Sequence, residues 1–318
     1  MRNAKRSFKR EKRFLLLMPE YMMGGAETQF RYLINYAEKK NWKLDAIIEH
    51  RFREDDSLLK KDAAQMTSVR LYEVDRCRDG SDRLFQAVII CILRHLLLVQ
   101  YSACLIYNPA DLVFAPIMRI FGIRVIYSER IDGCYIAGNQ YYQKCLKSCS
   151  HILANSEYAQ NELKKLTGRK VGLIRNGKPI VQPFPVKENR EIRRILVPGR
   201  IIARKNQMLL LYYLRDYPGF EGKIVFAGNM EDKSYQGKMR SFINRNHLQE
   251  RVIFLGHVEE MSKEYEAADL VVLPSYSEGT PNVVLEAYAY GRPVIVSDIA
   301  MEREVVQDPD LRFGLKNT

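Results

Sequence analysis

Short apolar runs alternate with longer segments of helical periodicity along most of the chain. A run such as Leu270 to Leu273 is typical of a buried strand, and the segments between runs have the length of helices. Because parallel strands need helical crossovers, the alternation predicts α/β folding with parallel sheets covered by helices. The predicted strands are 14–18, 44–48, 69–74, 103–107, 124–128, 151–154, 171–174, 195–198, 223–227, 252–255, 270–273 and 294–297.

One segment interrupts this alternation about halfway along the chain. It contains three prolines and many charged residues, which is typical of a linker. A chain of 318 residues is also long for a single core and suits two domains. We therefore predict two Rossmann-like, doubly wound domains that face each other across a cleft. The predicted parts are a basic extension at 1–13, domains at 14–178 and 193–318, and a linker at 179–192.

Positive charge is concentrated in the first predicted domain. Residues 1–178 contain 31 Lys and Arg against 19 Asp and Glu, whereas residues 179–318 contain 19 of each. Seven bases lie within residues 1–13, opposed only by Glu11. Such a run attracts an anionic membrane surface or nucleic acid, or is simply a solvated terminus. No zinc-finger spacing, helix-turn-helix pattern or interleaved aromatic and basic motif accompanies it, which argues against nucleic acid.

The cysteines and the apolar segments bear on where the protein works. Six cysteines, all in the first half, form neither C-x-x-C pairs nor a metal-type cluster, which predicts reduced thiols in the cytoplasm. The apolar stretch 14–18 is too short for the core of a signal peptide. Residues 84–99 are interrupted by polar side chains and are too short for a membrane span. We expect a cytoplasmic protein that rests, at most, on the inner face of a membrane.

Two glutamates eight positions apart, Glu278 and Glu286, follow the strand predicted at 270–273. Glu278 lies in the loop after this strand and Glu286 in the next helix. The N–H groups of Asn282 and Val283 would face the carboxyl edge of the sheet, where open α/β sheets bind ligands and a helix N-terminus favours phosphate. Carboxylates beside an anion site suit the hydroxyl groups of a nucleotide sugar. The alternative is a turn glutamate and a solvated helix glutamate.

Basic residues and glycines follow other predicted strands. Arg200 and Lys205 come after strand 195–198, and a guanidinium with a compact ammonium group suits a leaving diphosphate, although such loop bases are often solvated. Gly24 and Gly25 follow strand 14–18 and either permit close approach of a ligand or form a simple turn. Their spacing is not G-x-G-x-x-G, which argues against a nicotinamide-dependent dehydrogenase.

Together these motifs resemble those of the retaining glycosyltransferases of family 4, among the glycosyl transferases group 1, which have the GT-B fold. Each motif alone is common, but their order and spacing are specific, and the resemblance covers most of the chain. The matching motifs are Gly24-Gly25-Ala26-Glu27, Gly199-Arg200 with Lys205-Asn206, Phe226-Ala227-Gly228, Phe254-Leu255-Gly256, the Glu-x7-Glu element formed by Glu278 and Glu286, and Gly291-Arg292-Pro293-Val294-Ile295.

The resemblance implies a role for each matching residue. Glu286 would bind the ribose hydroxyls, and Glu278 would contact the donor sugar near the reacting carbon. Arg200 and Lys205 would stabilise the departing diphosphate, so that neither a metal nor another cofactor is expected. The remaining residues implied to border the nucleotide and its phosphates are Gly24, Gly25, Gly228, Gly256, His257, Asn282 and Val283.

The activity implied by the resemblance is transfer of a sugar from a UDP- or GDP-linked donor, with retention at the anomeric carbon. The acceptor would be a saccharide or a lipid-linked glycan in surface polysaccharide biosynthesis. In this interpretation Glu278 positions the sugar and does not act as a nucleophile. The alternatives are a sugar-nucleotide epimerase on the same architecture and an inactive protein that binds nucleotides or glycans.

Two features depart from the family pattern. Arg130 stands near a strand end where relatives often have a histidine. Arg130 and Asp132 either line the acceptor or donor side of the cleft or pair with each other. The family also continues through further strands and helices after Ser297-Asp298, so we expect the segment that closes the GT-B fold to be missing.

Overall fold

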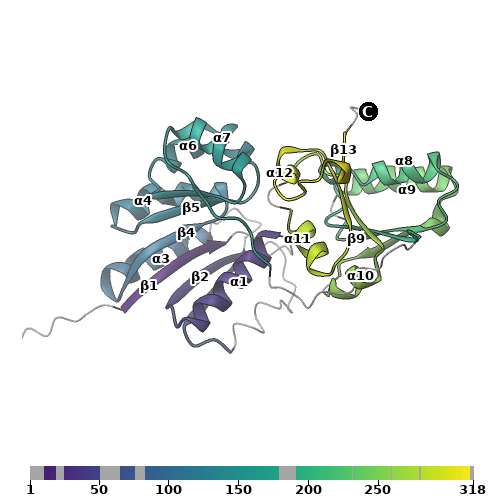
Figure 1. Cartoon of the computed structure of the whole chain (residues 1–318). Helices are drawn as coiled ribbons and strands as arrows, with labels where there is room; N and C mark the ends of the chain where they lie inside the picture. The colour runs from purple at the N-terminus through teal and green to yellow at the C-terminus, as the bar shows by residue number, and fades with distance from the viewer. Residues whose placement is uncertain are drawn as a thin grey trace, which may run out of the picture. The chain divides into compact units, whose positions relative to one another are not determined.

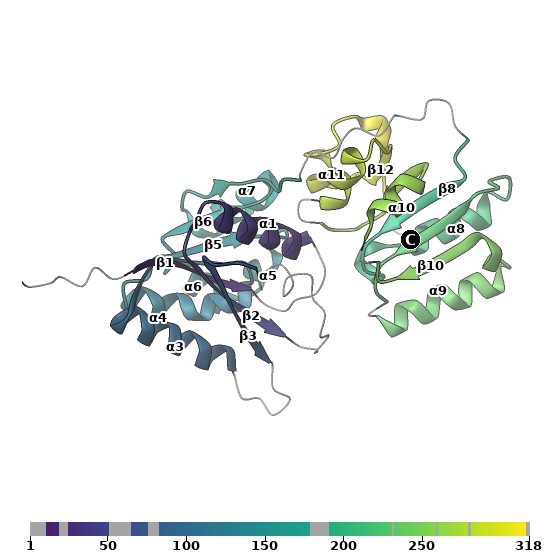
Figure 2. The ribbon, with the colours of Figure 1, turned by 90° about the horizontal axis from the view of Figure 1, so that it is seen from below.

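A computed structural model describes residues 11–18, 25–50, 65–75, 83–178, 191–230, 232–258, 260–278 and 281–315. The chain divides into two compact units, Met1–Ile174 and Arg175–Thr318. Each unit has one parallel sheet with helices on both faces (Figures 1 and 2), which confirms the two predicted Rossmann-like domains. The predicted cleft between them stays a prediction. Residues 175–178, which the sequence assigned to the first domain, group with the second unit, and most of the predicted linker lies outside the described residues.

The first unit contains a seven-stranded sheet in the order β3-β2-β1-β4-β5-β6-β7. All neighbouring strands are parallel. Each of the seven strands predicted for this unit is present. Their bounds are β1 Glu11–Met18, β2 Leu44–His50, β3 Val69–Asp75, β4 Val99–Ile106, β5 Val125–Glu129, β6 His151–Ala154 and β7 Gly172–Leu173.

Helices cover both faces of this sheet because alternate strand residues point to opposite sides. Leu16 of β1 packs in the core cluster that contains α1, whereas Leu17 packs in the cluster that contains α3. Helix α4 lies beside α3 in both views (Figures 1 and 2). The helical elements are α1 Gly25–Lys39, α3 Arg83–Leu97, η1 Pro109–Phe114, α4 Ala115–Ile120, α5 Cys134–Ala137, α6 Gln140–Leu146 and α7 Glu157–Thr167.

Strand β1 corrects the prediction that the basic extension reaches residue 13. The strand already begins at Glu11, and Arg13 is fully buried within it. Arg13 Nε donates to Asp45 Oδ1 at 2.8 Å, and Tyr101 Oη donates to Asp45 Oδ2 at 2.5 Å. Arg13 is therefore part of a buried polar network and not of a solvated terminus. Residues 1–10 lie outside the described part of the chain.

The second unit contains a six-stranded parallel sheet in the order β10-β9-β8-β11-β12-β13. The five strands predicted for it are present, and β13 is an addition. Its strands are β8 Arg194–Pro198, β9 Lys223–Ala227, β10 Val252–Gly256, β11 Leu270–Leu273, β12 Val294–Ser297 and β13 Arg312–Phe313. Its helical elements are η2 Ala203–Lys205, α8 Met208–Asp216, α9 Lys233–Arg245, η3 Gln249–Arg251, α10 Ser262–Ala267, α11 Asn282–Ala289, α12 Ala300–Arg303 and η4 Pro309–Leu311.

Two core clusters lie on opposite faces of the second sheet. Val197 of β8 packs in the cluster formed with α8 and α9, and Leu196 packs in the cluster formed with α10 and α11. Both views show α8 next to α9 on one side of the strands (Figures 1 and 2). Because all strands are parallel, the loops that follow β8, β9, β10 and β11 meet at a single edge, where the predicted site residues lie.

Candidate functional site

The loops after β8 and β11 are bonded to each other at the carboxyl edge of the second sheet. Arg204 Nη1 donates to the carbonyl oxygen of Ser277 at 2.8 Å, and the N–H of Tyr276 donates to the carbonyl oxygen of Arg204 at 2.9 Å. These bonds join segments more than seventy positions apart in the sequence. They hold the basic loop predicted to bind diphosphate against the loop that contains Glu278.

Glu278 and Lys205 form an ion pair across these two loops. Glu278 is buried, and its Oε1 also accepts a hydrogen bond from Ser275 Oγ. The carbonyl oxygen of Ser275 in turn accepts from Ser297 Oγ of β12 at 2.5 Å. Three neighbouring strands therefore contribute to the position of one carboxylate. Glu278, the predicted sugar contact, is thus adjacent to Lys205, a predicted diphosphate contact. Ser275 and Ser297 were not among the predicted site residues.

Glu286, in α11, is held through both carboxylate oxygens. Tyr265 Oη of α10 donates to its Oε2 at 2.6 Å, and Lys178 Nζ lies 2.6 Å from its Oε1. Burial, together with the negative charge of Glu286, raises the pKa of Tyr265 well above its ordinary value. Tyr265 is therefore a neutral hydrogen-bond donor to Glu286. Neither Tyr265 nor Lys178 was predicted, because each comes from an element distant in the sequence.

Helix α11 begins at Asn282, directly after Pro281. Asn282 is buried, and its Oδ1 accepts a hydrogen bond from Asn176 Nδ2 at 2.9 Å. Val283, the second residue of the helix, is partly buried. The helix N-terminus therefore lies directly after the loop that holds Glu278, as the sequence predicts.

The remaining predicted residues of this unit follow the other strands. Arg200 is partly buried at the end of β8, and its carbonyl oxygen accepts from Gln207 Nε2 at 2.8 Å. Gly228 follows β9, where a Cβ atom would meet the carbonyl oxygen of Gly199 at 2.1 Å, so only glycine fits. Gly256 has a positive φ of 68° at the end of β10, and the exposed His257 follows it. All four predicted residues share the carboxyl edge with Glu278.

Four of the predicted site residues, Gly24, Gly25, Arg130 and Asp132, belong to the first unit. Gly24 lies outside the described residues, and Gly25 is the first residue of α1. The guanidinium group of Arg130 lies 4.3 Å from the ring centroid of Tyr107. Asp132 Oδ1 accepts from the N–H of Cys134 at 3.0 Å. A role of Arg130 and Asp132 in lining a cleft stays a prediction.

Glu302, a carboxylic acid near this site, was not predicted. This residue of α12 has no exposed surface, and neither of its carboxyl oxygens has a hydrogen-bond partner among the described residues. Burial, reinforced by the negative charge of Glu278 and opposed by Lys205, raises the pKa of Glu302 from 4.5 to about 8. A glutamate in a short charged helix has no sequence signal that separates it from a solvated one.

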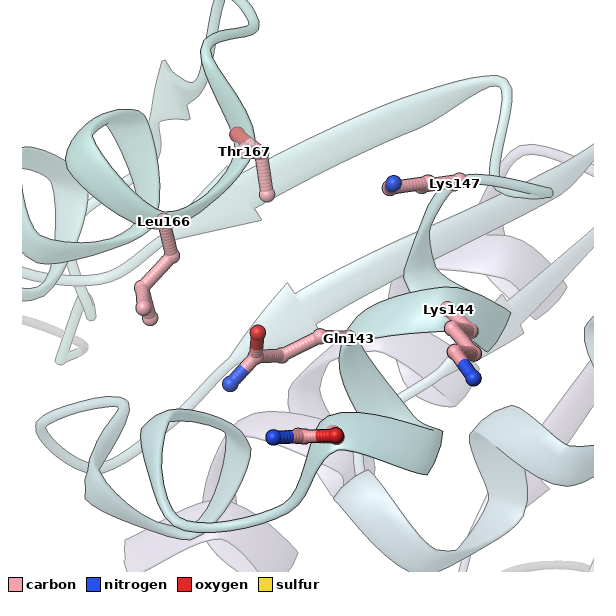
Figure 3. Close-up of a pocket in the computed structure, with 6 residues that line it drawn as sticks. Gln143, Lys144, Lys147, Leu166 and Thr167 are labelled. Carbon is pink, nitrogen blue, oxygen red and sulfur yellow. The ribbon is translucent and has the colours of Figure 1, made fainter.

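The first unit contains a depression of its own. Residues of α6 and α7, or directly beside them, line it, and Figure 3 shows Lys144 and Lys147 opposite Leu166 and Thr167. None of the predicted site residues takes part in it. Among the residues that the structure describes, no three or more His, Cys, Asp or Glu side chains form a group that would hold a metal ion.

Residues 192–315, most of the second unit, match the family model for glycosyl transferases group 1. The TuaC protein of Bacillus subtilis (strain 168), named as a teichuronic acid biosynthesis glycosyltransferase, is 32% identical over 190 residues, which are 55% of this chain and 44% of TuaC. CapH of Staphylococcus aureus, a capsular polysaccharide biosynthesis glycosyltransferase, is 30% identical over 164 residues, 49% of this chain and 45% of CapH. The matched residues thus span less than half of either relative.

Solved structures extend the similarity to both units. Anabaena Alr3699/HepE, crystallised in complex with UDP and glucose, superposes with a TM-score of 0.76 at 21% identity, over 94% of this chain and 83% of that chain. The chain therefore has the two-domain GT-B fold, as predicted. Its second unit matches the glycosyl transferases group 1 family model over residues 192–315, which confirms the resemblance at that level, whereas membership of family 4 stays a prediction.

Proposed function

We propose that this protein transfers a sugar from a nucleotide-sugar donor to a saccharide or lipid-linked acceptor in surface polysaccharide biosynthesis. The observation that carries the proposal is the Lys205–Glu278 pair, held at the carboxyl edge of a glycosyl transferases group 1 domain. The names of TuaC and CapH support the polysaccharide pathway. The UDP and glucose bound to HepE favour a UDP-linked donor over a GDP-linked one.

In the proposed site the two glutamates hold hydroxyl groups and the two bases hold phosphates. Glu286 binds the ribose, and Glu278 positions the donor sugar. Arg200 and Lys205 stabilise the diphosphate as it leaves, because cationic donors aimed at developing negative charge lower the barrier. Lys205, now bonded to Glu278, exchanges that carboxylate for phosphate oxygens. The ends of β9 and β10, at Gly228 and at Gly256 with His257, border the nucleotide.

The proposed reaction breaks the bond between the anomeric carbon and the diphosphate oxygen and forms a bond to the acceptor oxygen on the same face of the sugar. The acceptor oxygen attacks the anomeric carbon directly and its proton passes to the leaving diphosphate, so that neither a protein nucleophile nor a protein base is required. Two basic side chains take the charge that a metal neutralises in other transferases. We therefore propose a retaining, metal-independent reaction.

A donor screen followed by a turnover assay tests this proposal. A nucleotide sugar that binds only the folded chain raises its stability, by about 2.7 kcal/mol at a concentration of a hundred times Kd. Product analysis with a lipid-linked acceptor, with and without EDTA, then identifies the transfer and its anomeric configuration. Lys205→Ala should lower turnover roughly 100- to 1,000-fold, whereas Lys263→Ala, an exposed lysine of α10, should not.

Two results would contradict the transferase. Conversion of the donor to an epimer without any acceptor would identify an epimerase instead. If the protein binds nucleotides but turns over no donor in the presence of acceptor, it is a nucleotide-binding protein without transferase activity.

We further propose that the first unit docks on an anionic membrane surface through α3 and α4. Six apolar side chains on α3 or directly after it are exposed, and the most exposed are Leu97 at 73% and Leu98 at 67%. Ile120, at the end of the neighbouring α4, is 79% exposed. Contiguous exposed apolar surface of this kind marks a protein or membrane contact. No helix in the described part of the chain is both long and apolar enough to span a membrane.

The charge of the chain favours a membrane as the partner of this face. Glu11, the first residue of β1, pairs with Val99, which directly follows Leu97 and Leu98. Residues 1–10, which precede Glu11 in the sequence, contain five bases and no acidic residue. Apolar side chains next to a cluster of bases match a bilayer with anionic headgroups. A cytoplasmic protein at the inner face of the membrane is part of the same proposal.

Sedimentation with vesicles tests this docking face. Wild type should bind phosphatidylglycerol vesicles more tightly than phosphatidylcholine vesicles at low salt, and deletion of residues 2–10 should remove the difference. Leu97→Glu with Leu98→Glu should abolish binding, whereas Ile174→Glu, an exposed residue after β7, should not. Unchanged binding of the double variant would overturn the proposal, and a loss of self-association instead would identify a contact between copies of the chain.

A further inference from the structure

Glu302 lies beside the proposed catalytic pair and has no role in the function proposed above. It is fully buried, and its carboxyl oxygens have no hydrogen-bond partner within the described residues. Buried polar groups are nearly always bonded, so an exception points to strain, to a functional role or to a missing ligand. The charged and titratable groups that interact with Glu302 are Glu278 after β11, Lys205 of η2 and Tyr288 of α11.

Two carboxyl groups therefore lie within the electrostatic reach of one lysine. In the structure Lys205 is bonded to Glu278, and Glu302 is left without a hydrogen bond. The proposed function turns Lys205 toward the donor diphosphate, which removes the cation that Glu278 contacts. Two neighbouring buried carboxylates without a cation are strongly unfavourable, and one of them then keeps a proton. Ser275 remains as a donor to Glu278, but it is neutral.

We propose that Glu302 is a positioning residue for Glu278. As a neutral acid it donates its O–H to the Glu278 carboxylate once Lys205 has turned to the diphosphate, and so keeps Glu278 ionised and oriented toward the donor sugar. The proton stays on Glu302 throughout, and no bond of the substrate involves it. This inference rests on the proposed function of Glu278 and Lys205.

The protonation of Glu302 is consistent with this role at neutral pH. Its burial comes first among the causes that raise its pKa to about 8, and the charge of Glu278 comes second. The neutral acid is therefore the main form at pH 7. Above about pH 8 Glu302 ionises, competes with Glu278 for Lys205 and loses the O–H that the proposal requires.

The pH dependence of turnover separates positioning from a purely structural role. In the wild type, kcat/KM, which reports protonation in the donor-free protein, should fall by up to about tenfold for each pH unit above about 8, because the protonated fraction falls by that factor. Glu302→Gln keeps an N–H donor that does not ionise, so its kcat/KM should be retained on the alkaline side. Glu302→Ala should lose turnover at every pH while its Kd for UDP is unchanged. Glu266→Gln on the exposed side of α10 is the matched control and should follow the wild type.

The same experiment distinguishes two kinds of failure. Superimposable pH profiles for wild type and Glu302→Gln, with UDP bound by both, would overturn the role of Glu302 alone. Absence of UDP binding and of any transfer by the wild type would overturn the proposed function and this inference with it. If Glu302→Ala fails to fold, as shown by circular dichroism, the comparison of wild type with Glu302→Gln still decides the question.

Discussion

Replacing Glu302 by glutamine should stabilise the second unit in alkaline solution, whatever the protein catalyses. Burial, with the nearby charge of Glu278, raises the pKa of this carboxyl group from 4.5 to about 8. Between these values the folded protein holds a proton that the unfolded chain has released, so the free energy of unfolding falls as the pH rises. At about 1.4 kcal/mol for each pKa unit, the loss reaches roughly 5 kcal/mol above pH 8.

Glutamine has nearly the same shape as glutamic acid and no proton to release. The difference in free energy of unfolding between Glu302→Gln and wild type should therefore be nearly constant below about pH 4 and should grow in favour of the variant up to about pH 8. Urea unfolding, followed by circular dichroism across this range, measures it. Glu266→Gln, an exposed control, should stay within about 0.5 kcal/mol of wild type. A difference for Glu302→Gln that does not change with pH would refute the reasoning.

Three further predictions concern other sites. Asp45→Ala should lower the free energy of unfolding by about 3 to 5 kcal/mol, because it removes the buried carboxylate that Arg13 bonds and leaves Arg13 only the half-exposed Glu11; urea unfolding of the first unit measures this, and an unchanged midpoint would contradict it. Gly228→Ala should destabilise the second unit, as measured by calorimetry, because the new Cβ atom would meet a backbone oxygen at 2.1 Å. Gly237 of α9 has open space around it, so Gly237→Ala should instead stabilise the unit by about 0.5 to 1 kcal/mol. Glu286→Gln should weaken UDP binding by about 1.5 to 3 kcal/mol in titration calorimetry, because a charged hydrogen-bond acceptor is lost; an unchanged Kd would exclude ribose binding by Glu286.

Most of the fold was predictable because strands buried on both faces have continuous apolar runs. All twelve predicted strands are present, and the pairings within both sheets are parallel, as helical crossovers between successive strands predict. Strand β13, Arg312–Phe313, was missed because two residues with one charge carry no such run. The first residues of β1, Glu11 to Arg13, were missed because their charges are typical of a solvated terminus.

Arg13 shows that a local sequence pattern does not contain the distant partners of a buried charge. Its partner Asp45 is 32 positions away, and Tyr101, which bonds the same carboxylate, is 56 positions from Asp45. These groups meet only because β2 and β4 both pair with β1. A charged residue can be assigned to the interior only when its partners are known, since an unpaired buried charge is strongly unfavourable.

In the candidate site, too, some contacts follow from the sequence pattern and others depend on residues that are distant in the sequence. Glu278 and Lys205 are in contact, and Arg200 lies at the same edge, because each follows a strand of one parallel sheet and the carboxyl ends of such strands share an edge. Lys178 and Tyr265, which hold Glu286, come from a segment before β8 and from α10. No spacing rule relates them to Glu286, so only the folded chain shows the contact.

Carboxylates beside a predicted phosphate site would repel the phosphate, and the contacts of the two glutamates explain how this repulsion is avoided. Glu278 is paired with Lys205 and Glu286 with Lys178, so each negative charge is already balanced before a donor arrives. A nucleotide sugar brings both kinds of partner, because its phosphates attract the lysine and its hydroxyl groups donate to the carboxylate that the lysine leaves. In the proposed function, donor binding at Glu278 would therefore be an exchange of partners in which no buried charge is left unpaired. A phosphate without the sugar would pair with Lys205 but would leave Glu278 without a new hydrogen-bond donor. The hydroxyl groups of the sugar are therefore needed to replace the lysine at Glu278.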